Sequence, residues 1–237
     1  YNECKKNGIK PIIGCEVYTT NHLDSKIKEQ FHLILLAINN IGYHNLVRLV
    51  SEATQHVYYK PLVDKNLLRK YSDGLICLSA CIGGEIPRAI LNNDIPAAKK
   101  AVEEFIDIYG KDDFYIEIQN HGIKEEATAG TELINLANAY ALKLVATNDI
   151  HYIEKEDWEA QDTLLCLQTG SFIDDVKRMR FPQHEFYFKS QKEMYDLLHD
   201  YHHCLSNTKE IADKCNVEIE YGQKLAPSFP KVPDGFT

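Results

Sequence analysis

The chain has 237 residues, of which 44% are apolar and 26% charged, and its net charge is −9. These values are typical of a globular protein with one large α/β domain or two smaller ones. The sequence contains no run of 18 apolar residues, so no membrane span is predicted. A domain whose main task is to bind phosphates usually has a basic face, whereas this chain is acidic overall. Two interpretations stay open: the chain binds nucleic acid only weakly by itself, or it holds cations in a pocket lined by carboxylates. Seven scattered cysteines without a CxxC pair favour reduced thiols in a cytoplasmic protein.

Short apolar segments alternate with helical patterns along the first two thirds of the chain. Residues 1–6 have the pattern of the last turns of a helix and lack an initial methionine, which predicts an internal piece of a longer polypeptide. Apolar runs predict strands at 9–18, 32–38, 74–80, 114–119 and 143–147. Amphipathic spacing predicts helices at about 46–53, 98–109 and 124–142. The alternation indicates βα units around a parallel sheet, and five strands suit a barrel whose first units are absent.

The pattern changes after Trp158. Helices are predicted at about 158–168, 191–201 and 206–215, with an irregular stretch at 171–188. Prolines without helical spacing follow, and they predict a linker into another domain at 223–237. We therefore interpret 1–222 as one α/β domain with a helical extension from about 157.

Asp149 and His151 form the most informative pair in the sequence. They follow an apolar strand directly, and residues two apart in an extended chain project to the same side. The carboxyl ends of strands are where α/β barrels place their ligand sites. The pair therefore predicts a divalent metal ion held by an oxygen and an imidazole nitrogen. The alternative is a helix-capping aspartate beside a surface histidine.

Three further candidates lie at other strand ends, and each has an ordinary explanation as well. Glu16 could be a solvated strand terminus, His32 a buried core histidine, and Cys81 a small buried apolar residue. Taken together with Asp149 and His151, they provide oxygen, nitrogen and sulfur donors on successive units, a mixture suited to zinc or manganese.

Polar residues beside these candidates have less specific roles. Glu117 alternates with apolar residues in a predicted strand and His121 follows that strand, so we expect both at the rim of the pocket in supporting roles. Lys177, Arg178 and Arg180 form the one compact basic cluster. They could touch a DNA phosphate, but a solvated loop or an interdomain contact is the favoured interpretation.

Several segments resemble the PHP domain of bacterial DNA polymerase III alpha subunits, the C-family replicative polymerases. The motifs, in chain order, are GIKPIIGCEVY at 8–18, SACIGGEIP at 79–87, ATNDIHY at 146–152, RMRF at 178–181, EFYFKS at 185–190, SNT at 206–208 and FPKVPDG at 229–235. The resemblance covers essentially the whole chain. It implies a PHP-type distorted (β/α)7 barrel that here lacks its first strands.

The resemblance also implies a metal cluster. Glu16, His32, Cys81, Asp149 and His151 match ligand positions of the family. The family's other ligands lie in a His-x-His segment, an acidic residue and an Asp-His-Gly segment that would precede Tyr1, so an incomplete site is expected. Zinc is the first expectation for the divalent ion, with manganese or magnesium as alternatives.

For function, the resemblance implies a DNA-directed DNA polymerase whose nucleotidyl-transfer residues would lie beyond Thr237. The present segment would be a 3′–5′ exonuclease that hydrolyses phosphodiesters, or a metal-stabilised docking domain. Its implied partners are the polymerase core of the same chain, a proofreading exonuclease subunit, other replisome subunits, and DNA through the full-length protein. The alternative is a free-standing PHP phosphoesterase, against which the FPKVPDG tail counts.

Overall fold

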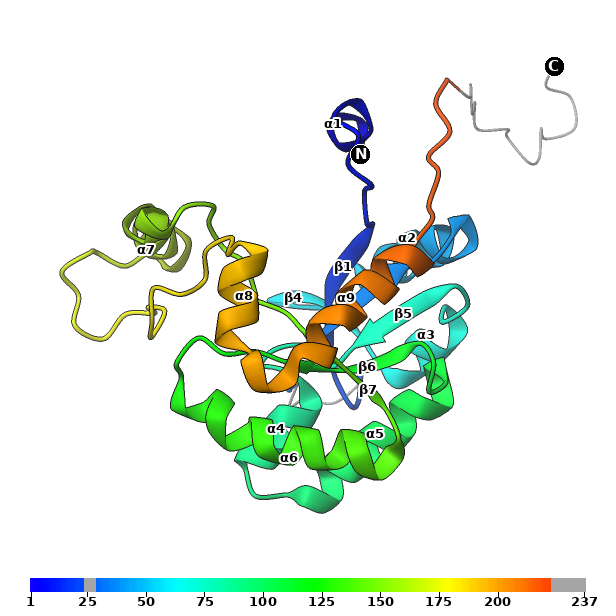
Figure 1. The fold of residues 1–237 in the computed structure, drawn as a ribbon, viewed down its shortest axis with the longest axis horizontal. Helices are drawn as coiled ribbons and strands as arrows, with labels where there is room; N and C mark the ends of the chain where they lie inside the picture. The colour runs from blue at the N-terminus through cyan, green and yellow to red at the C-terminus, as the bar shows by residue number, and fades with distance from the viewer. Residues whose placement is uncertain (24–28, 223–237) are drawn as a thin grey trace, which may run out of the picture.

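A seven-stranded sheet forms the centre of the computed structural model, which describes residues 1–23 and 29–222; the predicted linker at 223–237 lies outside the described residues. The strand order is β3-β4-β1-β2-β5-β6-β7 (Figure 1). The strands are β1 (Gly14–Thr19), β2 (Phe31–Ala37), β3 (Val57–Tyr58), β4 (Lys60–Val63), β5 (Leu75–Leu78), β6 (Phe114–Ile118) and β7 (Lys143–Ala146). The five predicted strands are confirmed as β1, β2, β5, β6 and β7, and the short β3 and β4 were not predicted.

The direction of the strands differs from the prediction of a parallel sheet. β5, β6 and β7 are parallel, but β2 pairs antiparallel with both β1 and β5. Parallel neighbours need a crossover of about a dozen residues or more, usually a helix. The connection from Thr19 to Phe31 is at the lower limit of that length and carries no helical pattern. The apolar run of β2 indicates burial on both faces, which does not distinguish the two directions.

Helices lie on both faces of the sheet. They are α1 (Asn2–Lys6), α2 (Asn40–Ala53), α3 (Lys65–Lys70), α4 (Glu85–Leu91), α5 (Ile95–Tyr109), α6 (Lys124–Tyr140), α7 (Trp158–Thr169), α8 (Gln191–Leu197) and α9 (His202–Lys214), with 3₁₀ turns at Lys155–Asp157 and His199–Tyr201. The predicted helices are confirmed, with the stretch 191–201 divided into α8 and a 3₁₀ turn, and α3 and α4 are additional. No helix in 1–23 or 29–222 is long and apolar enough to cross a membrane.

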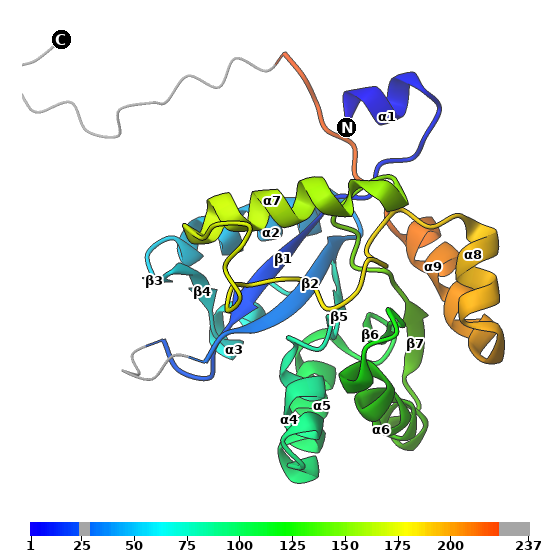
Figure 2. The ribbon, with the colours of Figure 1, turned by 90° about the vertical axis from the view of Figure 1, so that its left-hand side faces the viewer.

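Side chains alternate between two apolar layers, as the period of a strand requires. Leu35, Ile116 and Leu144 point into the larger layer, which α2, α4, α5 and α6 cover. Ile76, Tyr115 and Val145 point to the other face. There α9 packs through Ile211, together with Cys215 directly after the helix (Figure 2). Because helices cover both faces of the sheet, the side chains on both sides of the strands are mostly apolar. The strand sequences are therefore nearly continuous apolar runs.

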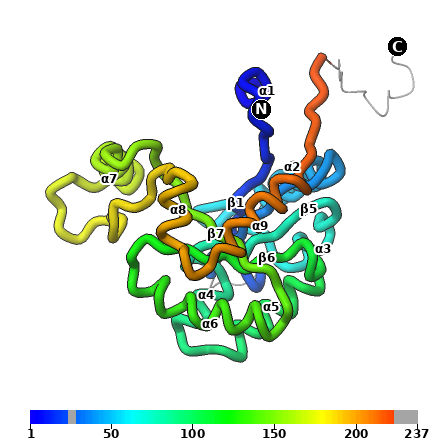
Figure 3. Tube along the Cα trace, in the orientation of Figure 1, coloured from blue at the N-terminus to red at the C-terminus, as the bar shows by residue number. Residues whose placement is uncertain are grey.

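The ends of the described sheet stay apart. β3 and β7 are the outermost strands, and they do not pair with each other among the described residues. The mixed α/β class is therefore confirmed, and closure into a distorted barrel stays a prediction. The path of the chain in Figure 3 also shows α7 and the loop after it standing away from the sheet.

Candidate metal centre

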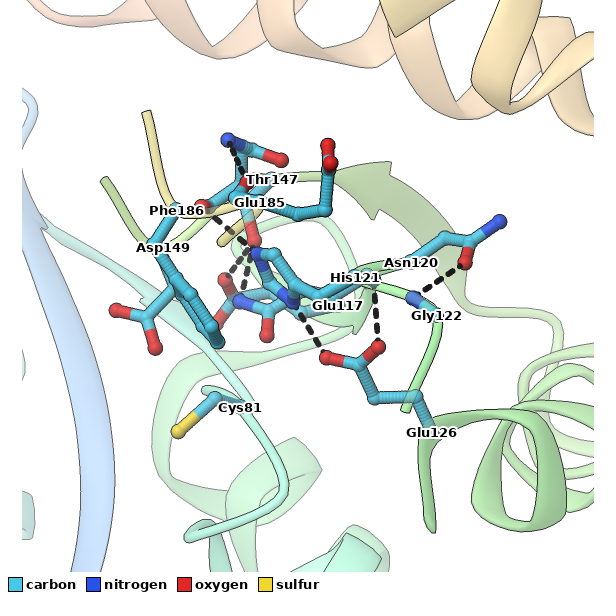
Figure 4. A network of polar contacts seen from close by, with 12 residues as sticks. Cys81, Glu117, Asn120, His121, Gly122, Glu126, Thr147, Asp149, Glu185 and Phe186 are labelled. Carbon is cyan, nitrogen blue, oxygen red and sulfur yellow. Dashed lines mark hydrogen bonds and ion pairs between the residues drawn. The ribbon is translucent and has the colours of Figure 1, made fainter. Parts of the chain in front are cut away.

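The five predicted ligands come from four chain segments that meet at one edge of the sheet. Glu16 lies in β1, and His32 lies near the start of β2, which runs antiparallel to β1. Cys81 follows β5, and Asp149 and His151 follow β7. Because β5 and β7 run in the same direction, their carboxyl ends meet at this edge. Figure 4 shows the carboxylate of Asp149 and the thiol of Cys81 on the same side of the surrounding network.

His32 lies between two of the other candidates. Its Nδ1 is 3.5 Å from the Cys81 sulfur and 3.7 Å from Glu16 Oε1. The backbone N–H of His32 donates to the carbonyl of Gly83, which fixes the loop after β5 against β2. A Cβ at Gly83 would lie 3.1 Å from the imidazole ring, so a glycine there lets the loop rest directly on His32.

The charges of the site act on one another. Burial, helped by the charges of Asp149, Glu117 and Glu16, raises the pKa of the Cys81 thiol to about 12, although a hydrogen bond from the Gly83 N–H opposes the shift. Burial also raises the pKa of Tyr18, as do the charge of Glu16 and, to a smaller extent, those of Cys81 and Asp149. Negative groups from β1, β6 and the loop after β7 are therefore close enough to repel one another, and a cation placed among them would relieve the repulsion.

Asp149 and His151 are arranged differently from the extended pair that the sequence predicted. β7 ends at Ala146, and Asp149 takes a left-handed backbone conformation with φ of 41°. His151 Nδ1 lies 2.6 Å from the backbone carbonyl of Asp149 and 3.9 Å from its Oδ1. The two side chains still lie together, but through a turn, because short polar aspartate tolerates this conformation better than most residues.

Glu117 joins the loops that carry the candidates. It is 4% exposed, and its carboxylate accepts hydrogen bonds from the Ala80 N–H and from the Thr147 hydroxyl, the latter at 2.7 Å. Burial raises the pKa of Glu117 to about 7, and these hydrogen bonds oppose the shift. It thus connects the residue before Cys81 with the segment before Asp149.

His121 is 1% exposed and acts as a second connection. Its Nδ1 is 2.5 Å from Glu126 Oε1, its Nε2 is 3.0 Å from the Asn148 carbonyl, and its ring stacks on Phe186 at 4.1 Å. Both ring nitrogens face oxygen atoms, a carboxylate at Nδ1 and a backbone carbonyl at Nε2, so the ring joins Glu126 to the segment before Asp149. The predicted rim residue is therefore a buried clamp on the backbone next to Asp149.

The segment 185–189 also holds the site, and sequence reasoning did not assign it this role. The buried Lys189 donates to Asn148 Oδ1 at 3.3 Å, and Asn148 Nδ2 donates to the Tyr187 carbonyl at 2.8 Å. The N–H of His151 donates to the Phe186 carbonyl at 2.8 Å. A lysine among aromatic residues, in EFYFKS, was the available signal.

The donor set fits a divalent ion by its chemistry, since it combines thiol, imidazole and carboxylates. Among the residues that the structure describes, however, no three His, Cys, Asp or Glu side chains are grouped so that they could hold a metal ion as they lie. The candidates approach in two sets instead, one around His32 and the other at Asp149 and His151.

Comparison with known proteins agrees with the motifs. The PHP domain family matches residues 1–121. The chain is 46% identical to the DNA polymerase III subunit alpha of Borreliella burgdorferi, over 97% of this chain and 21% of that protein. It is 40% identical to the same subunit of Treponema pallidum and 41% identical to that of Thermus aquaticus, over 99% and 98% of this chain and 20% of each relative. The chain thus spans about a fifth of the length of these relatives. It belongs to the PHP domain family and is homologous over nearly its whole length to DNA polymerase III alpha subunits.

Proposed function

We propose that the chain is the metal-binding PHP part of a bacterial replicative DNA polymerase III alpha subunit, acting in the cytoplasm. The alignment of 97% of the chain with one such subunit supports this assignment over a free-standing phosphoesterase. The parent protein would carry out DNA-directed DNA synthesis with residues in the remaining four fifths of its length. The mixed sheet would then be the larger part of a distorted (β/α)7 barrel.

Within this part, Glu16, His32, Cys81, Asp149 and His151 would hold the divalent metal, with zinc favoured by the thiol and imidazole donors and manganese or magnesium as alternatives. The observation that carries the proposal is the position of His32 Nδ1, 3.5 Å from the Cys81 sulfur and 3.7 Å from Glu16 Oε1. Glu117 joins the loops that carry the two sets of donors, since it accepts hydrogen bonds from Ala80, before Cys81, and from Thr147, before Asp149.

The reaction that this site supports is hydrolysis of a phosphodiester at the 3′ end of DNA. A bound divalent ion would supply charge for the phosphate and a water of lowered pKa. The chain's own residues would set the geometry: Glu117 fixes the loops at Ala80 and Thr147, and His121 fixes the carbonyl of Asn148. The metal-bearing side chains would thus be held by a rigid network.

Hydrolysis is tested with a 5′-labelled single-stranded oligonucleotide and the intact alpha subunit. We expect shortening from the 3′ end that chelator abolishes, and a loss of at least about a hundredfold in Asp149→Ala, as befits removal of a ligand. The matched control is Asp174→Ala, an exposed carboxylate on the loop after α7, which should keep full activity. Activity that is insensitive to both chelator and Asp149→Ala would contradict the proposal.

A docking role is the second candidate, and exposed apolar residues favour it. Leu167, Phe172 and Val176, on α7 and the loop after it, are 77%, 79% and 93% exposed. Exposed apolar side chains gathered on one segment are typical of an interaction surface. The polymerase core of the same polypeptide is the proposed partner, with the proofreading exonuclease subunit, other replisome subunits and DNA as further partners of the parent protein.

Docking is tested by hydrogen exchange over 164–179, measured in the isolated chain and in the intact subunit. The proposal predicts strong additional protection in the intact subunit, with no change at the exposed hairpin of β3 and β4 as an internal control. Equal exchange in both would exclude the polymerase core as the partner of this surface.

A further inference from the structure

A small pocket lies between α7 and the loop that returns from it. It has a volume of about 100 Å³ and is open to solvent. Its lining comes from one stretch of the chain: Tyr152, Trp158, Asp162, Leu165, Arg180, Phe181, Gln183 and His184. Neither the predicted metal ligands nor the residues that support them line it.

A buried ion pair gives the pocket its shape. Arg178, whose side chain is 2% exposed, binds both carboxylate oxygens of Asp162 and so fixes the loop to α7. Its Nε also donates to the Ile173 carbonyl at 3.1 Å. A bidentate pair of this kind positions the backbone on either side of it. The guanidinium of Arg178 is thus engaged within the chain and is not free to bind a DNA phosphate.

Flat rings line the pocket. Trp158 and His184 stack on each other at 3.8 Å with an angle of 8° between their planes. Phe181 also lines the pocket. Successive aromatic faces of this kind bind nucleobases by stacking, without regard to sequence. An engineered cavity of roughly 150 Å³ admits benzene, so a pocket of about 100 Å³ that is open on one side accepts part of a single planar ring.

The charge of the lining suits a nucleotide. The carboxylate of Asp162 is neutralised by Arg178. Arg180 is exposed, and one of its terminal nitrogens donates to the carbonyls of Ile173 and Asp175 at 3.1 and 3.5 Å. Since a guanidinium has five N–H donors, others stay available to a phosphate or a base edge.

The ring of Phe181 connects the pocket to His151 of the candidate metal centre. Phe181 packs on His151 with ring centroids 4.6 Å apart, and on Phe186 at 4.7 Å. A base seated in the pocket would therefore lie next to the ring that packs on His151.

From these contacts we infer that the pocket binds one unpaired nucleobase of the DNA strand whose phosphate lies at the metal centre. The inference deepens the proposed hydrolytic function and names its substrate as a single-stranded 3′ end. A paired base presents only its edges to solvent, so duplex DNA would be excluded.

Trp158 is the one tryptophan in the sequence, so its fluorescence reports directly on the pocket. The chain is titrated in chelator with a thymidine pentamer and with an abasic pentamer of the same charge. We expect saturable quenching by the thymidine pentamer and none by the abasic one. Phe181→Leu should weaken binding about tenfold, as loss of one stacking contact predicts. Phe172→Leu, at an exposed site outside the pocket, should change it less than about twofold.

His184→Ala, at an exposed position, is the second variant and should weaken binding even if Phe181→Leu fails to fold. Equal quenching by the abasic pentamer, or equal binding by the His184→Ala and Phe172→Leu variants, would overturn the inference. So would quenching by N-acetylphenylalanine amide but not by thymidine, which would identify a protein side chain as the occupant. The chelator prevents hydrolysis, so the titration measures base binding alone. If the base binds but the intact subunit shows no nuclease activity, this inference stands and only the hydrolytic proposal is contradicted.

Discussion

Glu117 is a buried carboxyl group among other negative charges. Its pKa is raised to about 7, chiefly by burial, whereas the unfolded chain titrates near 4.5. Below pH 4.5 both states hold the proton, so the group adds no pH dependence there. As pH rises from 4.5 to 7 the unfolded state loses its proton first, and the free energy of unfolding therefore falls. Above pH 7 the group is ionised in both states, so the decrease in the free energy of unfolding is complete and stays constant.

Glu117→Gln should remove this pH dependence, because an amide does not ionise. We expect the free energy of unfolding of the variant, relative to the wild type, to rise by up to about 3 kcal/mol between pH 4.5 and 8. Urea unfolding in chelator measures it, with exposed Glu159→Gln as the control. A difference between Glu117→Gln and wild type that does not vary with pH would show that Glu117 titrates normally.

Replacement of His121 is predicted to lower the free energy of unfolding. The His121 side chain is 0% exposed and that of Glu126 is 7% exposed, so His121→Ala removes the imidazole partner of a buried carboxylate, which keeps only the backbone N–H of residue 121. The expected decrease in the free energy of unfolding is about 3 kcal/mol. His44→Ala, on the exposed side of α2, should change it little, and thermal unfolding compares the two. Equal melting temperatures for both variants would refute the clamp.

At the scale of elements, two helical glycines provide a matched pair. A Cβ at Gly42 in α2 would lie 1.8 Å from the carbonyl oxygen of Gly74, which accepts the N–H of Ile38. Gly130 in α6 has no atom within 4 Å of that position. Gly42→Ala should therefore destabilise the protein by about 2 kcal/mol through overpacking. Gly130→Ala should stabilise it by about 0.5–1 kcal/mol. Urea unfolding measures the change in the free energy of unfolding for each variant. A change of the same sign in both would contradict the packing described for α2.

The elements that could be predicted are those with strong periodic patterns. The apolar runs at β2 and β6 and the amphipathic spacing of α5 each depend on neighbouring residues alone. β3 and β4 are two and four residues long and include Pro61, so no period could form. The antiparallel direction of β2 depends on which strands it pairs with, and its own sequence is compatible with either direction.

At the scale of the whole molecule, the sequence predicted the candidate ligands but not how their segments are joined. Glu16, Cys81 and Asp149 were predicted together because strand ends of a sheet meet at one edge. Cys81 and Asp149 do follow β5 and β7, whereas Glu16 lies inside β1. Lys189 binds the side chain of Asn148, which lies 41 positions earlier in the chain, and the carbonyl of Phe186 accepts the N–H of His151. Contacts across such a separation depend on tertiary packing, so local pattern does not reveal them.

The proposed metal site consists of Glu16, His32, Cys81, Asp149 and His151, and Cys81 is its one sulfur ligand. Cobalt(II) titration of the isolated chain tests it directly, because a thiolate ligand gives an intense charge-transfer absorption in the near ultraviolet. Metal binding through Cys81 predicts this band in the wild type, its loss in Cys81→Ser, and its retention in Cys15→Ser, where the replaced thiol is half-buried next to Glu16. A wild type without the band, or a Cys81→Ser variant that keeps it, would exclude Cys81 as a metal ligand.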